Sequence, residues 1–106
     1  SGRLAGWVGL NVPKDFPNVL PAVEVGWRFD RALWGQGLAT EGGRASVQFA
    51  WDVVALERLI SLIQPDNIAS IRVAEKLGMQ DAGTTENEEN GVVRVFELER
   101  PAARAG

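Results

Sequence analysis

The sequence contains no cysteine, no histidine and no tyrosine. Without cysteine the chain can form neither disulfides nor thiolate metal sites. Without histidine it lacks the usual general base and the commonest metal ligand. Any proton transfer must therefore use a small set of other side chains, and we expect no metal site.

Two further shortages limit the expected partners. Lys and Arg total 11 against 14 Asp and Glu, which gives a net charge of −3, whereas a nucleic-acid partner demands clustered positive charge. No apolar run approaches the roughly 20 residues that a membrane-spanning helix needs. We therefore expect a soluble, cytoplasmic protein with neither a nucleic-acid nor a membrane partner.

The 106 residues, of which 45% are hydrophobic and 24% charged, have the composition of one small globular domain. We assign residues 1–100 to that domain. Pro101–Gly106 has no periodicity and is expected to be a disordered tail.

The first part of the chain predicts two antiparallel strands. Leu4–Leu10 is short, apolar and bracketed by turn formers. Asn11–Pro21 contains three prolines and is expected to be a loop. Ala22–Phe29 alternates with period 2, so that one face carries Val23, Val25, Trp27 and Phe29 and the other carries Glu24, Gly26 and Arg28.

A helix and a buried strand follow. From Ala39 to about Ala55 the apolar residues have helical spacing and cover so much of the circumference that we expect the helix to be covered on more than one side. Leu59–Ile63 is nearly unbroken apolar sequence, which is typical of a central strand buried on both faces. Residues 22–63 thus predict a βαβ unit with parallel strands and a right-handed crossover.

The remainder predicts a second helix and a hairpin. Asp66 or Asn67 supplies the N-cap of the helix, and Gly78 follows it as a C′ residue. The helix turns Ile68, Ile71 and Ala74 inward. The elements expected after it are a weak strand or loop at Met79–Thr85, an acidic turn at Glu86–Asn90, a hairpin signal at Asn90-Gly91 and a closing antiparallel strand at Val92–Leu98.

The turn between the strand at 22–29 and the long helix has the composition of an anion site. Gly35 and Gly37 let main-chain N–H groups face one point, and the helix start adds unpaired N–H groups and the positive end of its dipole. A phosphate or pyrophosphate suits such a site; the alternative is that the glycines only make a tight turn. No lysine follows at P-loop spacing, which disfavours a nucleotide-binding domain. Gly42 and Gly43 permit close packing of the helix on the sheet or on a ligand.

Two motifs resemble those of the GNAT superfamily, acyltransferases that move acyl groups from coenzyme A to amines. Trp34-Gly35-Gln36-Gly37-Leu38-Ala39 is similar to the family turn Gln/Arg-x-x-Gly-x-Gly/Ala, with Trp34 at its first position. The form Trp-Gly-x-Gly-x-Ala-Thr-Glu resembles the RimJ/RimL-like branch, which acetylates protein N-termini. The block from Asn67 to Met79 is similar to that branch's Asn-x-x-Ser…Glu-Lys-Leu-Gly-Phe, with Met79 in place of Phe.

The resemblance implies an α/β (α+β) GNAT-like mixed sheet and direct acetyl transfer from acetyl-CoA to an amine, with the α-amino group of a protein or peptide as the first guess. It implies that the diphosphate lies on the main chain of the glycine turn. It also implies that the pantetheine arm enters between the strands at 22–29 and 59–63, bonded to main-chain groups. The cofactor-binding residues it implies are Trp27, Arg28, Phe29, Trp34, Gly35, Gln36, Gly37, Leu38, Ala39, Thr40 and Asn67.

The resemblance also indicates catalytic candidates. Glu24 lies close to where many family members carry a general-base glutamate; the alternative is a solvated strand carboxylate. Ser70 is the hydroxyl that the branch is expected to place at the coenzyme A sulfur; the alternative is a polar residue at a helix start. Glu86–Glu89 is either a solvated hairpin tip or a group of carboxylates that attracts a cationic acceptor.

The resemblance covers roughly the C-terminal two-thirds of a GNAT domain. The family's first strand, two following helices and second strand have no counterpart, so we expect a domain truncated at its N-terminal side. This leaves a rival hypothesis, a non-catalytic fragment that binds coenzyme A or oligomerises. An uncovered sheet edge would favour a homodimer.

Overall fold

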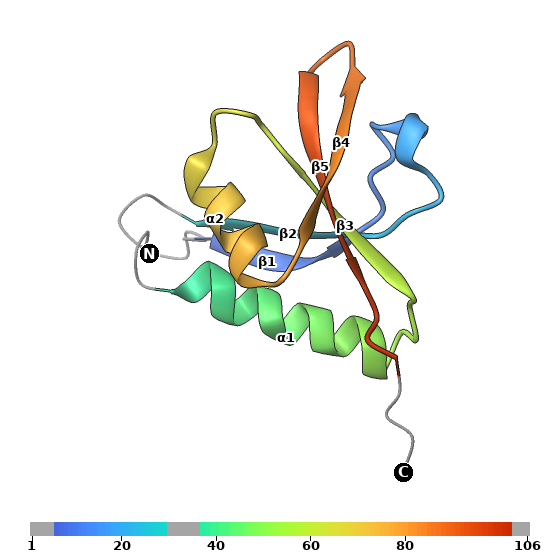
Figure 1. Cartoon of the computed structure of the whole chain (residues 1–106), viewed down its shortest axis with the longest axis vertical. Helices are drawn as coiled ribbons and strands as arrows, with labels where there is room; N and C mark the ends of the chain where they lie inside the picture. The colour runs from blue at the N-terminus through green and yellow to red at the C-terminus, as the bar shows by residue number, and fades with distance from the viewer. Residues whose placement is uncertain (1–5, 30–36, 103–106) are drawn as a thin grey trace.

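The computed structural model describes residues 6–29 and 37–102. Five strands form one mixed sheet in the order β1-β2-β3-β5-β4, and two helices pack against it (Figure 1). This confirms the predicted α/β fold class. The elements are β1 (Gly6–Asn11), a 3-10 turn η1 (Pro17–Val19), β2 (Glu24–Phe29), α1 (Leu38–Asp52), β3 (Arg58–Ile63), α2 (Ile68–Lys76), β4 (Gln80–Asn87) and β5 (Gly91–Glu99).

The sheet is built around β3. β1 and β2 pair antiparallel along their whole length, from Gly6 opposite Phe29 to Asn11 opposite Glu24. β2 and β3 are parallel and are joined by α1, which confirms the predicted βαβ unit. On its other side β3 pairs antiparallel with β5. Leu59 and Ile60 are fully buried on opposite faces of β3, as a central strand requires.

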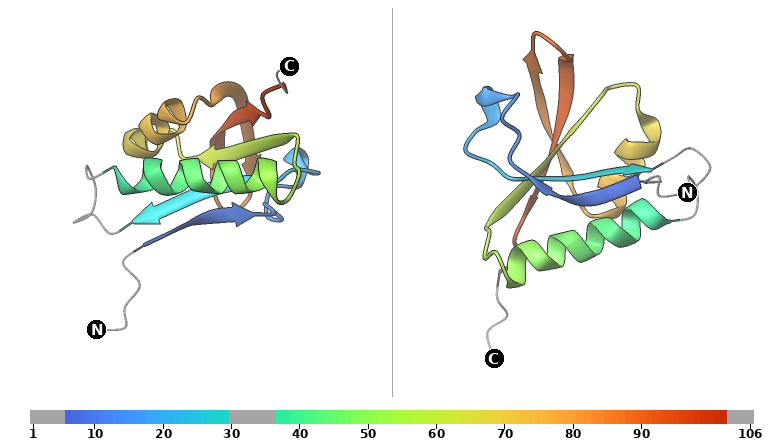
Figure 2. Two further views of the ribbon diagram at one scale, coloured as in Figure 1. Left: turned by 90° about the horizontal axis from the view of Figure 1, so that it is seen from below. Right: turned by 180° about the vertical axis from the view of Figure 1, so that it is seen from behind.

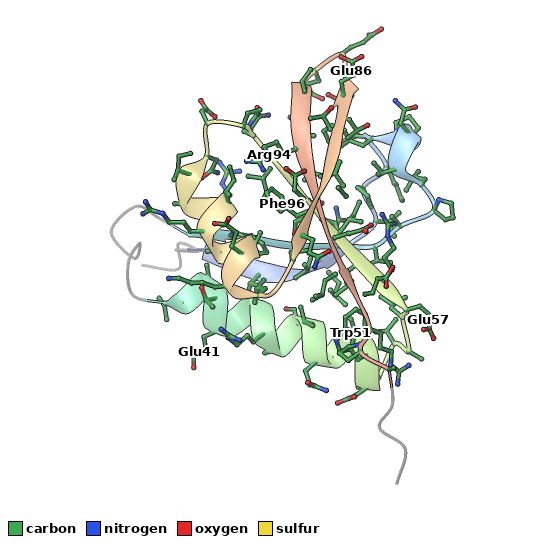
Figure 3. The ribbon with its side chains drawn as sticks, viewed as in Figure 1. Glu41, Trp51, Glu57, Glu86, Arg94 and Phe96 are labelled. Carbon is green, nitrogen blue, oxygen red and sulfur yellow. The ribbon has the colours of Figure 1, made fainter. Side chains whose placement is uncertain are left out.

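Both helices pack on the same face of the sheet and share one hydrophobic core. Ala50 and Trp51 of α1 and Ile71 and Ala74 of α2 meet Phe96 of β5 in this cluster. Figure 3 shows Trp51 near the C-terminal end of α1, and Figure 2 shows the helices and the strong twist of the sheet from two other sides. The cluster is completed by Val25, Leu59, Ile63 and Met79.

The apolar residues predicted to be covered in and just after α1 are covered only in part. Phe49, Val53 and Val54 expose 51%, 67% and 45% of their surface. The helix contacts β1, β2 and α2, and its buried residues Ala50 and Trp51 lie in the core. In α2, Ile68 was expected to point inward but is 54% exposed, because it is the first residue of the helix.

Both predicted ends of α2 are confirmed. The side chain of Asn67, not of Asp66, is the N-cap and accepts a hydrogen bond from Ser70 N–H at 3.2 Å. At the other end Gly78 has a φ of +88°. The N–H groups of Gly78 and Met79 donate back to the carbonyls of Glu75 and Ala74, the pattern of a Schellman motif.

The C-terminal hairpin is longer than predicted. β4 runs to Asn87, so Glu86 lies in a strand rather than in the turn, and Gly91 opens β5 with a φ of +70°. Arg94 of β5 pairs with Asp81 at 2.8 Å and lies 4.8 Å from the Phe96 ring centroid (Figure 3). This ion pair ties β5 to β4 beside the irregular register between Asp81 and Thr84.

The described ranges include no helix that is both long and apolar enough to cross a lipid bilayer. Pro101 and Ala102 have no regular structure, and the rest of the predicted tail, 103–106, lies outside the described residues.

The two glycines in α1 allow close packing. A Cβ placed on Gly42 would lie 2.5 Å from Val8 Cγ1 of β1, and one on Gly43 would lie 2.9 Å from Leu77 Cδ1 just after α2. Of the two uses predicted for these glycines, the structure shows packing against neighbouring elements. Gly42 therefore sets how closely α1 approaches the sheet.

We expect Gly42→Ala to lower the free energy of unfolding by about 1–2 kcal/mol, because the overpacking against Val8 outweighs the gain in helix propensity. Urea denaturation measures this change. Gly43→Ala is the matched control, since the end of the flexible Leu77 side chain can move. Adding Val8→Ala should relieve the loss in Gly42→Ala. Equal stability of the two single variants would contradict this account.

Candidate functional site

The two parallel strands of the βαβ unit separate soon after they meet. Among the described residues, β2 and β3 share a single ladder pair, Glu24 with Ile60, close to the start of both strands. Ile60 N–H donates to the carbonyl of Val23 at 3.0 Å. Beyond this point the strands diverge toward their carboxyl ends (Figure 1). An open α/β sheet places its ligand at such carboxyl ends.

Two side chains form hydrogen bonds with main-chain groups at the point where β2 and β3 separate. Leu62 N–H donates to a carboxylate oxygen of Glu24 at 3.2 Å. The hydroxyl of Ser61 donates to the carbonyl of Val25 at 2.5 Å. Ser61 is only 2% exposed, and no other polar side chain in the described residues is buried to this degree. Glu24 is half-buried, so its environment is not that of a solvated strand carboxylate.

Beyond the separation, main-chain groups of β2 face β3 without a ladder partner. Because Val23 and Val25 direct their carbonyls toward β3, the alternate residue Trp27 directs its N–H and carbonyl the same way. No ladder pair to β3 uses these groups in the described structure. The Trp27 side chain is half-buried against the hydrophobic core, as expected for its apolar face.

The start of α1 carries main-chain donors that no helical carbonyl accepts. Gly37 is the N-cap residue, with a φ of +73°, and among the described residues no side chain caps the helix. The first intrahelical bond runs from Glu41 N–H to the Gly37 carbonyl. The N–H groups of Leu38–Thr40 therefore lack helical acceptors. The Glu41 side chain points away from the sheet and α2 (Figure 3).

α2 contributes two more predicted residues. Asn67 and Ser70 are both half-buried in the first turn, joined by the capping hydrogen bond. α2 follows directly on β3, so its N-terminus lies near the carboxyl end of that strand. The cap thus fixes Asn67 and Ser70 at the start of α2, beyond the carboxyl end of β3.

The remaining predicted residues lie elsewhere or outside the described residues. Arg28 is exposed and lies on the same face of β2 as Glu24. Phe29 ends β2. Trp34, Gly35 and Gln36 lie outside the described residues. The structure therefore places Glu24 at the point where β2 and β3 separate, Trp27 farther along β2, and Gly37–Thr40, Asn67 and Ser70 at the starts of the two helices.

Burial perturbs the Glu24 carboxylate. Loss of solvent raises the pKa of Glu24 above its ordinary value, while hydrogen bonds from Leu62 N–H and the Asn11 side chain draw the pKa back down. The net direction is upward, which brings the group nearer to the range useful for a general base.

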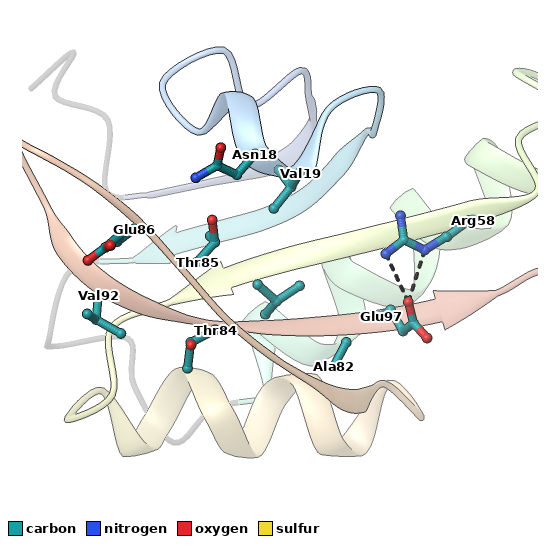
Figure 4. A pocket seen from close by; sticks show the side chains of 10 residues that line it. Asn18, Val19, Arg58, Ala82, Thr84, Thr85, Glu86, Val92 and Glu97 are labelled. Carbon is teal, nitrogen blue, oxygen red and sulfur yellow. Dashed lines mark hydrogen bonds and ion pairs between the residues drawn. The ribbon is translucent and has the colours of Figure 1, made fainter.

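A separate hollow of about 870 Å³ lies between β4, the loop containing η1 and the strands β3 and β5 (Figure 4). The ion pair between Arg58 and Glu97, at 2.9 Å, stands at one side of it. None of the predicted site residues that the structure describes lines this hollow. The residues that line it are Asn18, Val19, Arg58, Ala82, Thr84, Thr85, Glu86, Val92, Val95 and Glu97.

Sequence reasoning missed Ser61. Its signal is a single hydroxyl in the otherwise apolar run Leu59–Ile63, because a polar side chain inside a buried strand needs a hydrogen-bond partner. In the described residues no three acidic side chains come close enough together to hold a metal ion.

Comparison with known proteins assigns the chain to a family. Residues 1–80 match the family described as the acetyltransferase (GNAT) domain. The uncharacterized protein YkkB of Bacillus subtilis is 38% identical over 84 residues, which are 79% of this chain and 48% of YkkB. The chain thus spans about half the length of the curated relatives it matches.

Solved structures share the fold. The acetyltransferase from Agrobacterium tumefaciens superposes with a TM-score of 0.76 at 26% identity, over 94% of this chain and 56% of that protein. An aminoglycoside acetyltransferase, AAC(6′)-Ib, solved with coenzyme A, has a TM-score of 0.73 at 19% identity, over 94% of this chain and 62% of that one. With a match to three-quarters of its length and this fold, the chain belongs to the GNAT acetyltransferase family.

Proposed function

We propose that the chain binds acetyl-CoA in the cleft between β2 and β3 and passes the acetyl group directly to an amine. The observation that carries the proposal is the early separation of two parallel strands, at whose open end a helix presents uncapped N–H groups. Family membership and the coenzyme A in the solved aminoglycoside acetyltransferase support the choice of cofactor.

The start of α1 suits the diphosphate of the cofactor. The N–H groups of Leu38, Ala39 and Thr40 have no helical acceptors, and the dipole of α1 adds about half a positive charge at this end. Gly37 has no side chain to occupy the space in front of them; a Cβ there would meet no atom within 4 Å. The preceding residues Trp34, Gly35 and Gln36 extend the same turn in the sequence.

The extended arm of the cofactor suits the open edge of β2. Pantetheine carries amide groups, and the main chain of Trp27 offers one donor and one acceptor toward the cleft. In this arrangement the arm takes the place of the missing ladder partner, as an added strand does. Arg28 and Phe29 continue the strand toward the glycine turn.

Glu24 and Ser70 are the proposed catalytic residues. The amine nitrogen attacks the thioester carbonyl, the carbon–sulfur bond breaks, and an amide forms. Glu24 takes the proton that the amine loses, directly or through a water molecule. The Ser70 hydroxyl donates a hydrogen bond to the departing sulfur, while Asn67 caps the helix that carries it.

The proposed acceptor is the α-amino group of a protein or peptide. This choice rests on the RimJ/RimL-like form of the two motifs. Glu86, Glu88 and Glu89 are exposed at the hairpin tip, where their charge would attract a cationic amine. The rival hypothesis remains a fragment that binds coenzyme A without turnover, because the longer relatives carry residues that have no match here.

Calorimetric titration with acetyl-CoA, followed by an assay of thiol release with a mixture of peptides, tests the proposal. Binding with peptide-dependent thiol release supports it. Binding without release would leave only the rival hypothesis, and an absence of binding would refute both.

We expect Gly37→Asp to weaken acetyl-CoA binding at least about tenfold, because a carboxylate placed at the start of α1 repels the diphosphate. Gly37→Asn is the matched control: it has nearly the same size, tolerates a positive φ and carries no charge. Calorimetry on both variants separates charge from backbone strain. Equal affinities would contradict the placement of the diphosphate.

We expect Glu24→Gln to abolish most transfer and to retain acetyl-CoA affinity, because the amide oxygen can still accept from Leu62 N–H but cannot take a proton. In the parent chain the transfer rate should fall as the pH drops through the raised pKa of Glu24, since protonation removes the base. Initial rates and calorimetry measure the two effects. A variant as active as the parent would exclude Glu24 as the base.

A further inference from the structure

In a regular parallel ladder, the register of β2 and β3 would lead to a further main-chain hydrogen bond, which the strands do not form. After the pair of Glu24 and Ile60, a parallel ladder continues with Gly26 opposite Leu62. That step would join Leu62 N–H to the Val25 carbonyl and Trp27 N–H to the Leu62 carbonyl. Instead, Leu62 N–H donates to Glu24 and the Val25 carbonyl accepts from Ser61.

The two side chains reach these groups from opposite faces of the sheet. Glu24 shares a face with its ladder partner Ile60, and Ser61, the next residue, points to the other face, where it lies opposite Phe96. One carboxylate and one hydroxyl therefore replace both halves of the missing main-chain bond. Neither the donor nor the acceptor is left unpaired.

We propose that Ser61 is a positioning residue which, together with Glu24, holds this ladder step open and fixes where the cleft begins. The further statement that acetyl-CoA binds in the cleft opened in this way rests on the proposed function. The positioning itself rests on the two hydrogen bonds and the register.

Burial makes this role specific to a hydroxyl. Ser61 is 2% exposed and Val25 is fully buried. If the hydroxyl is removed, water therefore cannot reach the Val25 carbonyl and replace it as hydrogen-bond donor. In a Ser61→Ala chain the donor that the ladder register places beside the Val25 carbonyl is Leu62 N–H, which in the parent chain is bonded to Glu24. We expect Leu62 N–H to leave Glu24 and bond to Val25, which closes the next step of the ladder and draws Trp27 N–H toward the Leu62 carbonyl.

The direct test is a long-range HNCO experiment, which detects scalar coupling across a hydrogen bond, on the isotope-labelled 106-residue chain. In the parent chain, Leu62 N–H should couple to the side-chain carboxylate carbon of Glu24. In Ser61→Ala the coupling should move to the carbonyl carbon of Val25. Ser61→Thr keeps the hydroxyl and should retain the parent pattern, and Ser46→Ala on α1 controls for the loss of a serine.

Acetyl-CoA affinity gives a second readout. Reopening a closed ladder step costs about the free energy of one hydrogen bond. Ser61→Ala should therefore raise the dissociation constant of acetyl-CoA about five- to tenfold, whereas Ser46→Ala should leave it unchanged. Retention of the coupling to Glu24 in Ser61→Ala would overturn the proposal whatever the affinity. If the parent chain does not bind acetyl-CoA, the proposed function fails, while the coupling still decides the positioning role.

Discussion

This structure depends on the point where β2 and β3 stop pairing. There the two strands do not form the main-chain hydrogen bond that a continuous parallel ladder would have. Parallel strands normally stay paired, because every unpaired N–H or carbonyl inside a sheet is costly. Here Leu62 N–H and the Val25 carbonyl are paired with the side chains of Glu24 and Ser61 instead. The sheet can therefore open in its middle without a buried unpaired group at the point of opening.

Close packing positions the two helices on the sheet. Gly42 and Gly43 allow α1 to pack closely on β1 and beside α2. Both helix starts are consequently held at the end where the strands diverge, one uncapped at Gly37 and the other capped by Asn67. The two starts differ physically: in the described residues a side chain accepts from the first turn of α2, whereas none caps the first turn of α1.

The sequence predicted those features that local chemistry decides. The run Leu59–Ile63 indicated the central strand, Gly78 indicated the end of α2, and the alternation at 22–29 gave the correct inward face of β2. The two motifs indicated the family. These predictions are correct because each feature depends on a few neighbouring residues.

Features that depend on distant contacts escaped prediction. The apolar residues Phe49 and Val53 have the spacing of core residues, yet both are exposed, because tertiary contacts and not spacing decide which part of α1 is covered. The role of Ser61 depends on the register between two strands separated by a whole helix, which no local pattern encodes.

The measurement that tests the central claim most directly is a titration of the ¹⁵N-labelled chain with coenzyme A, followed in its amide spectrum. The account predicts that the largest shifts fall on the amides of Leu38, Ala39 and Thr40 and on that of Trp27, the donors left open by the uncapped helix and the separated strands. Shifts confined to the hollow beside Arg58 and Glu97, or no shifts at the start of α1, would contradict it.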